Sequence, residues 1–177
     1  MKRVILLLTG LVASSPAWAK TVPESSGVPS AVIAAALAEA DCFWPTGNEA
    51  VVSWPARPLG DALMLLEIPC WQAAYQAGSI LMAYAPNAPE EARLLRFPVP
   101  EGEGFTEKPS LTLPDYDPVT RQITSLHRAR GPGDCGTAGR WQWTGEAFAL
   151  ESYWDKPDCD AEPFDPFNAP EAWQVYP

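Results

Sequence analysis

The sequence predicts a mainly-β fold, an antiparallel sheet or meander, with one short N-terminal helix and two disulfide bonds. Short apolar runs separated by segments rich in proline and glycine are typical of strands and turns. An alanine-rich run near the N-terminus has the spacing of a helix. Four cysteines in a chain that begins with an export signal indicate disulfides before metal or redox chemistry.

The N-terminus predicts a secretory signal peptide over residues 1–19. Lys2 and Arg3 precede an apolar run over 4–12, and Ala17-Trp18-Ala19 is a small-residue cleavage signal that ends at Ala19. The apolar run is too short for a stable membrane anchor, and no cysteine follows the cleavage point to accept a lipid. We therefore expect a periplasmic protein, with secretion as the alternative, and no stable membrane insertion.

The remaining chain predicts a mobile tail over 20–28 and a single domain over 29–177, with 29–98 and 109–177 as two candidate β halves. Cleavage would remove Lys2 and Arg3 and no acid, which changes the net charge from -10 to -12. So acidic a chain disfavours nucleic acid and anionic membrane surfaces as partners and favours cationic proteins.

In the first half, Pro29-Ser30 opens a predicted helix over 31–40, in which Val32, Ile33 and Leu37 form one apolar stripe. Residues 71–78 fit either a helical turn or irregular structure. The other predicted elements of this half are a short strand at 51–54, strands at 63–68, 79–85 and 93–97, a turn at 86–89, and a surface connection at 98–108.

The second half predicts a four-strand meander that ends near Trp154. Strands over 111–116 and 121–129 flank a proline turn at 117–120. The other two strands form a tryptophan-rich hairpin over 141–150. The tail from 155 is predicted to be mostly loop, with its last aromatic residues returning to cover the sheet.

The hairpin is predicted from alternation, since Trp141 and Trp143 are two residues apart, as are Phe148 and Leu150. If Thr144-Gly145 is a two-residue turn, Trp141 stands directly across from Phe148. Such aromatic cross-strand pairs contribute roughly 0.2 to 1 kcal/mol beyond an alanine pair. The aromatic face is therefore interpreted as core.

Before the hairpin comes the most patterned stretch of the chain, a glycine-rich loop. Gly131, Gly133, Gly136 and Gly139 fall within nine residues, and glycine at this density indicates backbone torsions that other residues disfavour. Three further residues restrict the loop, a proline, an aspartate able to accept a backbone N–H and a cysteine able to anchor it, which are Pro132, Asp134 and Cys135. We expect a loop of defined shape.

These motifs resemble a known family. The block Arg130-Gly-Pro-Gly-Asp-Cys-Gly136, the pattern Trp-x-Trp-x-Gly-x-x-Phe-x-Leu up to Leu150, a later Cys159 and Ile68-Pro-Cys70 with Ala74-Tyr75 are similar to the proteobacterial extracytoplasmic family catalogued as domain of unknown function 1176. The resemblance spans much of the mature chain and implies no specific activity. The chain departs from the family pattern at Asp160, where a basic residue usually follows the last cysteine, and at Pro132.

The four cysteines allow three disulfide connectivities. We favour Cys42 with Cys70 and Cys135 with Cys159, because both pairings are local and each half of the chain then holds one bridge. Each bridge would contribute about 3 to 4 kcal/mol in the chain-entropy model.

Catalytic and metal sites are weaker interpretations. Cys135 follows the single histidine, His127, by eight residues, and a thiolate beside such a base could be a nucleophile, but an even cysteine count in an exported chain favours oxidation. One histidine without a C-x-x-C pair makes zinc unfavourable. A calcium loop among Asp155, Asp158, Asp160, Glu162 and Asp165, and a carboxylate pair at Asp115 and Asp117, are better interpreted as a solvated face and as turn residues. We predict no cofactor.

Charge is segregated along the C-terminal half. Residues 118–145 carry a net charge of +3 and residues 146–171 a net charge of -7. The arginines near the glycine loop could grip a carboxylate or phosphate of an envelope component, and the alternative is that they pair internally with the acidic tail. The predicted ligand or partner surface consists of Arg128, Arg130, Gly131, Gly133, Asp134 and Arg140.

Three functional hypotheses follow. The first is a non-enzymatic, disulfide-stabilised periplasmic module that binds an envelope protein or ligand through the glycine loop. The second is an acidic inhibitor of a cationic lytic enzyme of the lysozyme kind, whose association would be sensitive to salt. The third is a hydrolase that depends on Cys135 or on a carboxylate pair.

Overall fold

A computed structural model describes residues 28–40, 42, 56–169 and 171–177. The predicted signal peptide, most of the predicted tail and the predicted strand at 51–54 lie outside these residues. Within them the mainly-β prediction is confirmed, since one helix accompanies strands that all pair antiparallel. The predicted helix is also confirmed, with bounds Ser30–Glu39 for α1.

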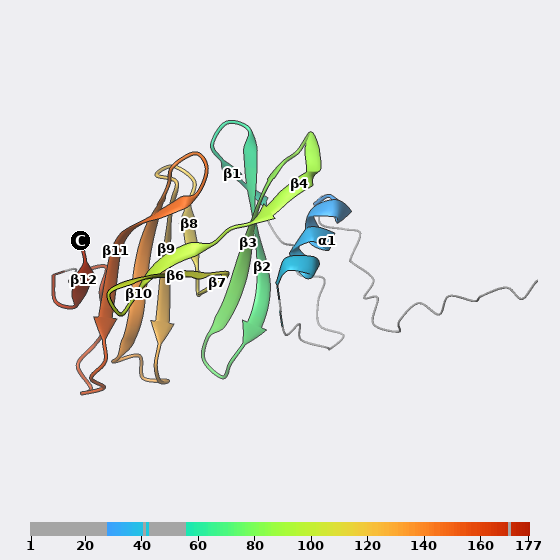
Figure 1. The fold of residues 1–177 in the computed structure, drawn as a ribbon. Helices are drawn as coiled ribbons and strands as arrows, with labels where there is room; N and C mark the ends of the chain where they lie inside the picture. The colour runs from blue at the N-terminus through green and yellow to red at the C-terminus, as the bar shows by residue number, and fades with distance from the viewer. Residues whose placement is uncertain (1–27, 41, 43–55, 170) are drawn as a thin grey trace, which may run out of the picture.

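The strands form two sheets and one separate hairpin (Figure 1). The first sheet contains β1 (Ala56–Leu59), β2 (Leu63–Gln72), β3 (Ala77–Ala85), β4 (Ala88–Leu94) and β7 (Ser110–Thr112). The separate hairpin consists of β5 (Phe97–Glu101) and β6 (Gly104–Lys108). The second sheet contains, in chain order, β8 (Asp115–Asp117), β9 (Gln122–Arg128), β10 (Gly136–Trp143), β11 (Phe148–Lys156) and β12 (Gln174–Tyr176).

The two sheets stand side by side and share one apolar core (Figure 1). That core combines first-sheet residues such as Leu65 and Leu81 with second-sheet residues such as Trp141 and Phe148, and the hairpin adds Phe97 between them. The rings of Phe97 and Trp141 meet edge to face with centroids 5.6 Å apart. The two sheets therefore bury their apolar faces against each other.

Two smaller clusters cover the outer faces. Helix α1 packs Val32 and Ala36 against the first sheet, beside Ile68 and Ile80. On the far side of the second sheet, the C-terminal segment returns with Phe164, Phe167 and Trp173 against Ala138 and Trp154. The aromatic tail thus covers the sheet as the sequence predicts, and it adds β12 as an edge strand beside β11.

In the first half, the observed strands continue through prolines at which the predicted strands end. Pro69 was expected to end a strand, but β2 continues to Gln72 because the register shifts between Pro69 and Trp71, and such a bulge tolerates a missing N–H. Residues 71–78 are consequently the end of β2, a tight turn and the start of β3, neither helical nor irregular throughout.

The predicted surface connection at 98–108 is instead the β5–β6 hairpin. Pro98 and Pro100 are two residues apart, so both missing N–H groups lie on one edge of β5. The Pro98 carbonyl accepts a hydrogen bond from the Trp141 indole at 2.8 Å, which ties this hairpin to the second sheet. The turn expected at 86–89 is shorter, because β4 already begins at Ala88, and the strand expected at 93–97 spans the break between β4 and β5.

The strand predicted over 111–116 divides between the two sheets. Leu113 has a positive φ of 44°, and the chain passes there from β7 in the first sheet to β8 in the second. The tryptophan hairpin exists, but its turn is longer than two residues, because Thr144 hydrogen-bonds to Ala147 and Trp143 pairs with Phe148. Trp141 pairs with Leu150, after a bulge, so the predicted Trp141–Phe148 pairing is wrong.

Both predicted disulfides are confirmed: Cys42 is bonded to Cys70 and Cys135 to Cys159. The first bridge joins the segment after α1 to β2, and the second joins the glycine loop to the segment after β11. In the part of the chain that the structure describes, no helix is long and apolar enough to cross a membrane.

Candidate functional site

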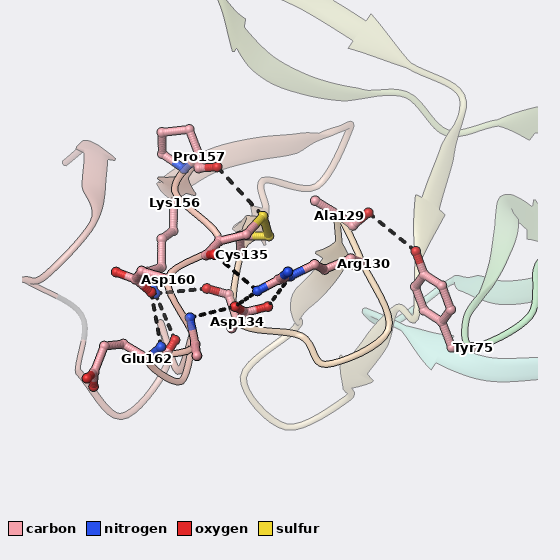
Figure 2. Close-up of a disulfide and its surroundings, with 11 residues drawn as sticks. Tyr75, Ala129, Arg130, Asp134, Cys135, Lys156, Pro157, Asp160 and Glu162 are labelled. Carbon is pink, nitrogen blue, oxygen red and sulfur yellow. Dashed lines mark hydrogen bonds and ion pairs between the residues drawn. A yellow bond between two sulfur atoms is a disulfide. The ribbon is translucent and has the colours of Figure 1, made fainter.

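The glycine-rich loop occupies residues 129–135, between the end of β9 and the start of β10. Figure 2 shows that it meets two other segments, the segment after β11 on one side and Tyr75 on the other. Cys135 is fully buried and fixes the loop covalently to Cys159. Within the loop, Ala129 N–H donates to the Cys135 carbonyl at 3.0 Å and Gly133 N–H donates to the Arg130 carbonyl at 3.0 Å.

Asp134 is the internal anion of this loop. Its side chain is 5% exposed and accepts two hydrogen bonds from the Arg130 guanidinium, the Nε bond being 2.8 Å long. The N–H of Ala161 also donates to Asp134, at 2.8 Å, and Arg130 Nη2 donates to the Cys159 carbonyl at 3.1 Å. The hydrogen bonds from Arg130, and then that from Ala161, hold the pKa of Asp134 well below its ordinary value against the opposing effect of burial.

Lys156 is a buried cation that contacts both the glycine loop and the segment after β11. It is 3% exposed, and its ammonium donates to the Asp134 carbonyl at 2.8 Å, to the Glu162 carbonyl at 2.7 Å and to the Asp160 carboxylate at 2.6 Å. The hydrogen bond from Lys156 is the main cause that lowers the pKa of Asp160. One buried cation therefore joins the glycine loop to the acidic segment, and all three of its donors are used.

The loop is also held from the first sheet. Gln76, 8% exposed, lies in the turn between β2 and β3, and its amide donates to the Arg128 carbonyl at 3.2 Å and accepts from the Arg128 N–H at 3.0 Å. The Tyr75 hydroxyl donates to the Ala129 carbonyl at 3.4 Å. Residues from both halves of the chain thus define the loop's shape.

Two glycines are required by the local backbone. Gly136 has a φ of 146°, and a Cβ there would lie 2.0 Å from the carbonyl oxygen of His127. Gly133 has a φ of 74°, and a Cβ there would lie 3.1 Å from the Arg128 side chain. Gly131 has no such constraint, because its Cβ would make an ordinary contact with Tyr75 at 3.8 Å.

The predicted site residues do not all gather on one surface. Arg130, Gly131, Gly133 and Asp134 lie together in the loop, and Arg128 packs against Gly133 from the end of β9. Arg140 lies apart from them, with its guanidinium over the rings of Trp154 and Phe167 at 5.5 and 5.9 Å. Arg130 is paired internally, as the alternative expected, but its partner is Asp134 of the same loop and not a side chain of the acidic tail.

Sequence reasoning missed Lys156, Gln76 and Tyr75. Lys156 is the single basic residue in the acidic run over 146–171, and its isolation among acids was a signal that it is paired. The pattern offered no comparable signal for Gln76, because its partner is a backbone amide far along the chain.

The structure also bears on the thiol, carboxylate and metal sites that the sequence made candidates. Cys135 is bonded to Cys159, so it presents no thiol beside His127. Asp117 accepts hydrogen bonds from the Val119 N–H and the Thr120 hydroxyl, both at 2.8 Å, which lower its pKa and identify it as a turn residue. Among the residues that the structure describes, no three His, Cys, Asp or Glu side chains gather closely enough to hold a metal ion.

Comparison with known proteins finds a family but no activity. A family model described as "Protein of unknown function (DUF1176)" matches residues 12–175. A protein of Escherichia coli (strain K12), "Uncharacterized protein YpfG", is 29% identical over 116 residues, which are 65% of this chain and 32% of that protein. The match therefore spans about a third of the length of this relative. No solved structure matches significantly.

Proposed function

Since the chain belongs to the family of unknown function DUF1176, whose description assigns no activity, we propose its function from the geometry of the glycine loop. The protein is an exported, disulfide-stabilised and non-enzymatic module of the periplasm that binds an envelope partner. The loop over 129–134 and the adjacent Tyr75 form its contact surface, which we call the loop surface.

The observation that carries this proposal is that the loop is fixed and yet exposed. Its backbone and buried side chains are held by Cys135, Lys156 and Gln76. Its outer residues, Ala129 to Pro132, remain exposed, and Tyr75 beside them is 42% exposed. A loop that is already ordered loses little entropy when a partner binds, and an exposed tyrosine offers a large contact at low entropic cost.

The charge of the surface favours an acidic partner group. The Arg130 side chain is 46% exposed although its Nε and Nη2 atoms are bound internally. Its Nη1 makes no hydrogen bond with any residue in the described part of the chain, so that edge of the guanidinium is available to a carboxylate of a partner. Arg130 therefore combines a structural contact with the proposed recognition contact.

Because Arg130 has both roles, substitution of Arg130 itself is a poor test of recognition. Arg130→Ala would leave Asp134 buried without its cation, so a loss of binding would not separate recognition from stability. Gly131→Glu tests recognition without removing a structural contact, because position 131 tolerates a side chain. The new carboxylate also adds a negative charge beside Arg130. Val119→Glu is the matched control, because Val119 is 88% exposed and lies in the turn between β8 and β9, whereas the glycine loop follows the other end of β9.

The test is affinity capture from periplasmic extract with wild type, Gly131→Glu and Val119→Glu as baits. We expect one or more partners that wild type and Val119→Glu retain and that Gly131→Glu loses, with unchanged thermal midpoints for both variants. Partners retained equally by all three baits would contradict the loop surface as the site of binding.

A second candidate function, an acidic inhibitor of a cationic lytic enzyme, is favoured by one observation. Within the described residues the exposed carboxylates of Asp158, Glu162, Asp165 and Glu171 form no ion pair. A titration with lysozyme at low and high salt tests it. Saturable binding that weakens as salt rises would support inhibition, whereas no binding at low salt would remove this candidate.

A further inference from the structure

A cleft lies between the second sheet and the β5, β6 and β7 strands. Its volume is about 360 Å³, which is within the range of small-molecule sites. The cleft is bounded on one side by β9, β10 and β11, and on the other by residues of β5, β6 and β7 that include Val99, Lys108 and Leu111.

Strand register defines the floor of this cleft. Ser125, Gly139 and Tyr153 lie side by side across three strands. Gly139 lacks a side chain, and the indole of Trp141 lies over it, because a Cβ there would be 2.1 Å from the indole Cη2. The floor is therefore the Gly139 backbone, against which the buried Trp141 indole packs, flanked by hydroxyl groups on the two neighbouring strands.

His127 lines the cleft and is exposed. Its Nδ1 lies 3.3 Å from the Gln76 amide nitrogen and 3.3 Å from the Thr112 hydroxyl. The two hydrogen bonds between Gln76 and the Arg128 backbone fix which end of that amide is the donor. Nδ1 of His127 must then accept, so the neutral ring carries its proton on Nε2. Nε2 makes no hydrogen bond with the residues that the structure describes.

The cleft is free of acids in an otherwise acidic protein. No Asp or Glu is among its lining residues in the described chain, whereas Lys108 and His127 both line it. Lys108 is exposed and forms no ion pair with a described residue. One carboxylate lies next to a lining residue: Asp155, which is exposed, is the cross-strand neighbour of Thr137. The site therefore differs in charge from a chain whose net charge is -10.

Hydroxyl groups supply the remaining polar contacts. The cleft is lined by five of them, Ser110, Thr112, Ser125, Thr137 and Tyr153. The Ser125 hydroxyl donates to the Thr112 carbonyl at 2.7 Å, and its lone pairs remain free to accept. Burial raises the pKa of Tyr153, and a hydrogen bond with the Thr137 side chain opposes this shift, so these two hydroxyls already contact each other. Such a lining suits a ligand that carries several hydroxyl groups.

We propose that this cleft binds a monosaccharide-sized organic anion, with its carboxylate or phosphate facing Lys108 and His127 and its hydroxyl-bearing body beside Ser125, Gly139 and Tyr153. Charge-assisted hydrogen bonds to the anion would give affinity, and the hydroxyl lining would give orientation. The inference does not depend on the loop surface, because none of the lining residues belongs to residues 129–134.

The experiment titrates the full chain with glucuronate, glucose 6-phosphate and glucose, and follows the amide resonances of Thr137 and Gly139 by NMR. We expect saturable shifts with at least one of the two anions, at the millimolar dissociation constant usual for so small a ligand. Glucose should bind at least about tenfold more weakly. Equal binding of glucose, or no shift of these amides with either anion, would overturn the proposal.

Three variants locate the contact. Lys108→Gln should weaken binding of the anion by at least about tenfold, and Asp155→Asn should strengthen it by removing a negative charge at the rim. Arg121→Gln removes an equal charge at the far end of β9 and should change nothing. Equal losses in Lys108→Gln and Arg121→Gln would show that net charge alone attracts the anion, and would overturn the assigned site.

Discussion

Removal of the Cys135–Cys159 bridge should destabilise the protein by an amount that depends on the number of residues between the two cysteines. The two cysteines are separated by 24 residues, for which the chain-entropy relation gives about 3.5 kcal/mol at 25 °C. The relation attributes this loss to the greater freedom of the unfolded chain. The double variant Cys135→Ala/Cys159→Ala should therefore retain the contact between Arg130 and Asp134 in its folded state.

The Cys42–Cys70 bridge provides the comparison. Its separation of 28 residues gives about 3.6 kcal/mol by the same relation. Removal of either bridge should then lower the free energy of unfolding almost equally, although the two bridges lie in different parts of the fold.

Equilibrium unfolding in urea measures both losses, with tryptophan fluorescence as the probe. The slope of the free energy against urea should rise in each variant, because an unbridged unfolded chain exposes more surface. Unchanged stability in the Cys135→Ala/Cys159→Ala variant would refute this reasoning. A much larger loss for that bridge than for Cys42–Cys70 would show that the second bridge acts through its native contacts instead.

Three further predictions concern the loop and its supports. Lys156→Met should cost at least about 2 kcal/mol in urea unfolding, because it leaves the buried carbonyl of Asp134, and also the carbonyl of Glu162, without their donor; a neutral result would contradict the buried network. Gly136→Ala should cost about 2 kcal/mol or more, whereas Gly131→Ala should stay within about 0.5 kcal/mol, and equal effects would show that Gly136 is not constrained. Because folding lowers the pKa of Asp134 from 3.8, its stabilisation is complete above about pH 5 and is lost as the pH falls below about 4. Asp134→Asn should thus lower the thermal midpoint at neutral pH and flatten its decline in acid, and parallel curves for the two proteins would exclude this linkage.

Local patterns predicted those parts of the fold that local interactions decide. The helix follows from Pro29 and an apolar stripe, and the disulfide pairing follows from proximity in sequence. The strand bounds failed at Pro69, Pro98 and Pro100, because whether a strand tolerates proline depends on its neighbour and on bulges, and neither is local.

In the candidate site, too, the local features were predicted and the long-range contacts were not. The glycine loop, its cysteine and Asp134 were visible as a dense motif, since each restricts the backbone where it stands. Gln76 and Arg128 are 52 residues apart, and Lys156 reaches Asp134 from a separate strand. The first contact forms only when the two sheets meet, and the second only when β10 pairs with β11. The sequence pattern therefore gave no signal for Gln76, and the cleft near Trp141 could not be anticipated.

The most direct test of the account is alkylation of the unreduced, folded protein, followed by peptide mass spectrometry. Oxidised sulfurs are what make this loop a shaped surface and not a nucleophilic site. We expect no alkylated cysteine and two cross-linked peptides, one with Cys42 and Cys70 and one with Cys135 and Cys159. An alkylated Cys135 would contradict the account and would favour catalysis at this loop.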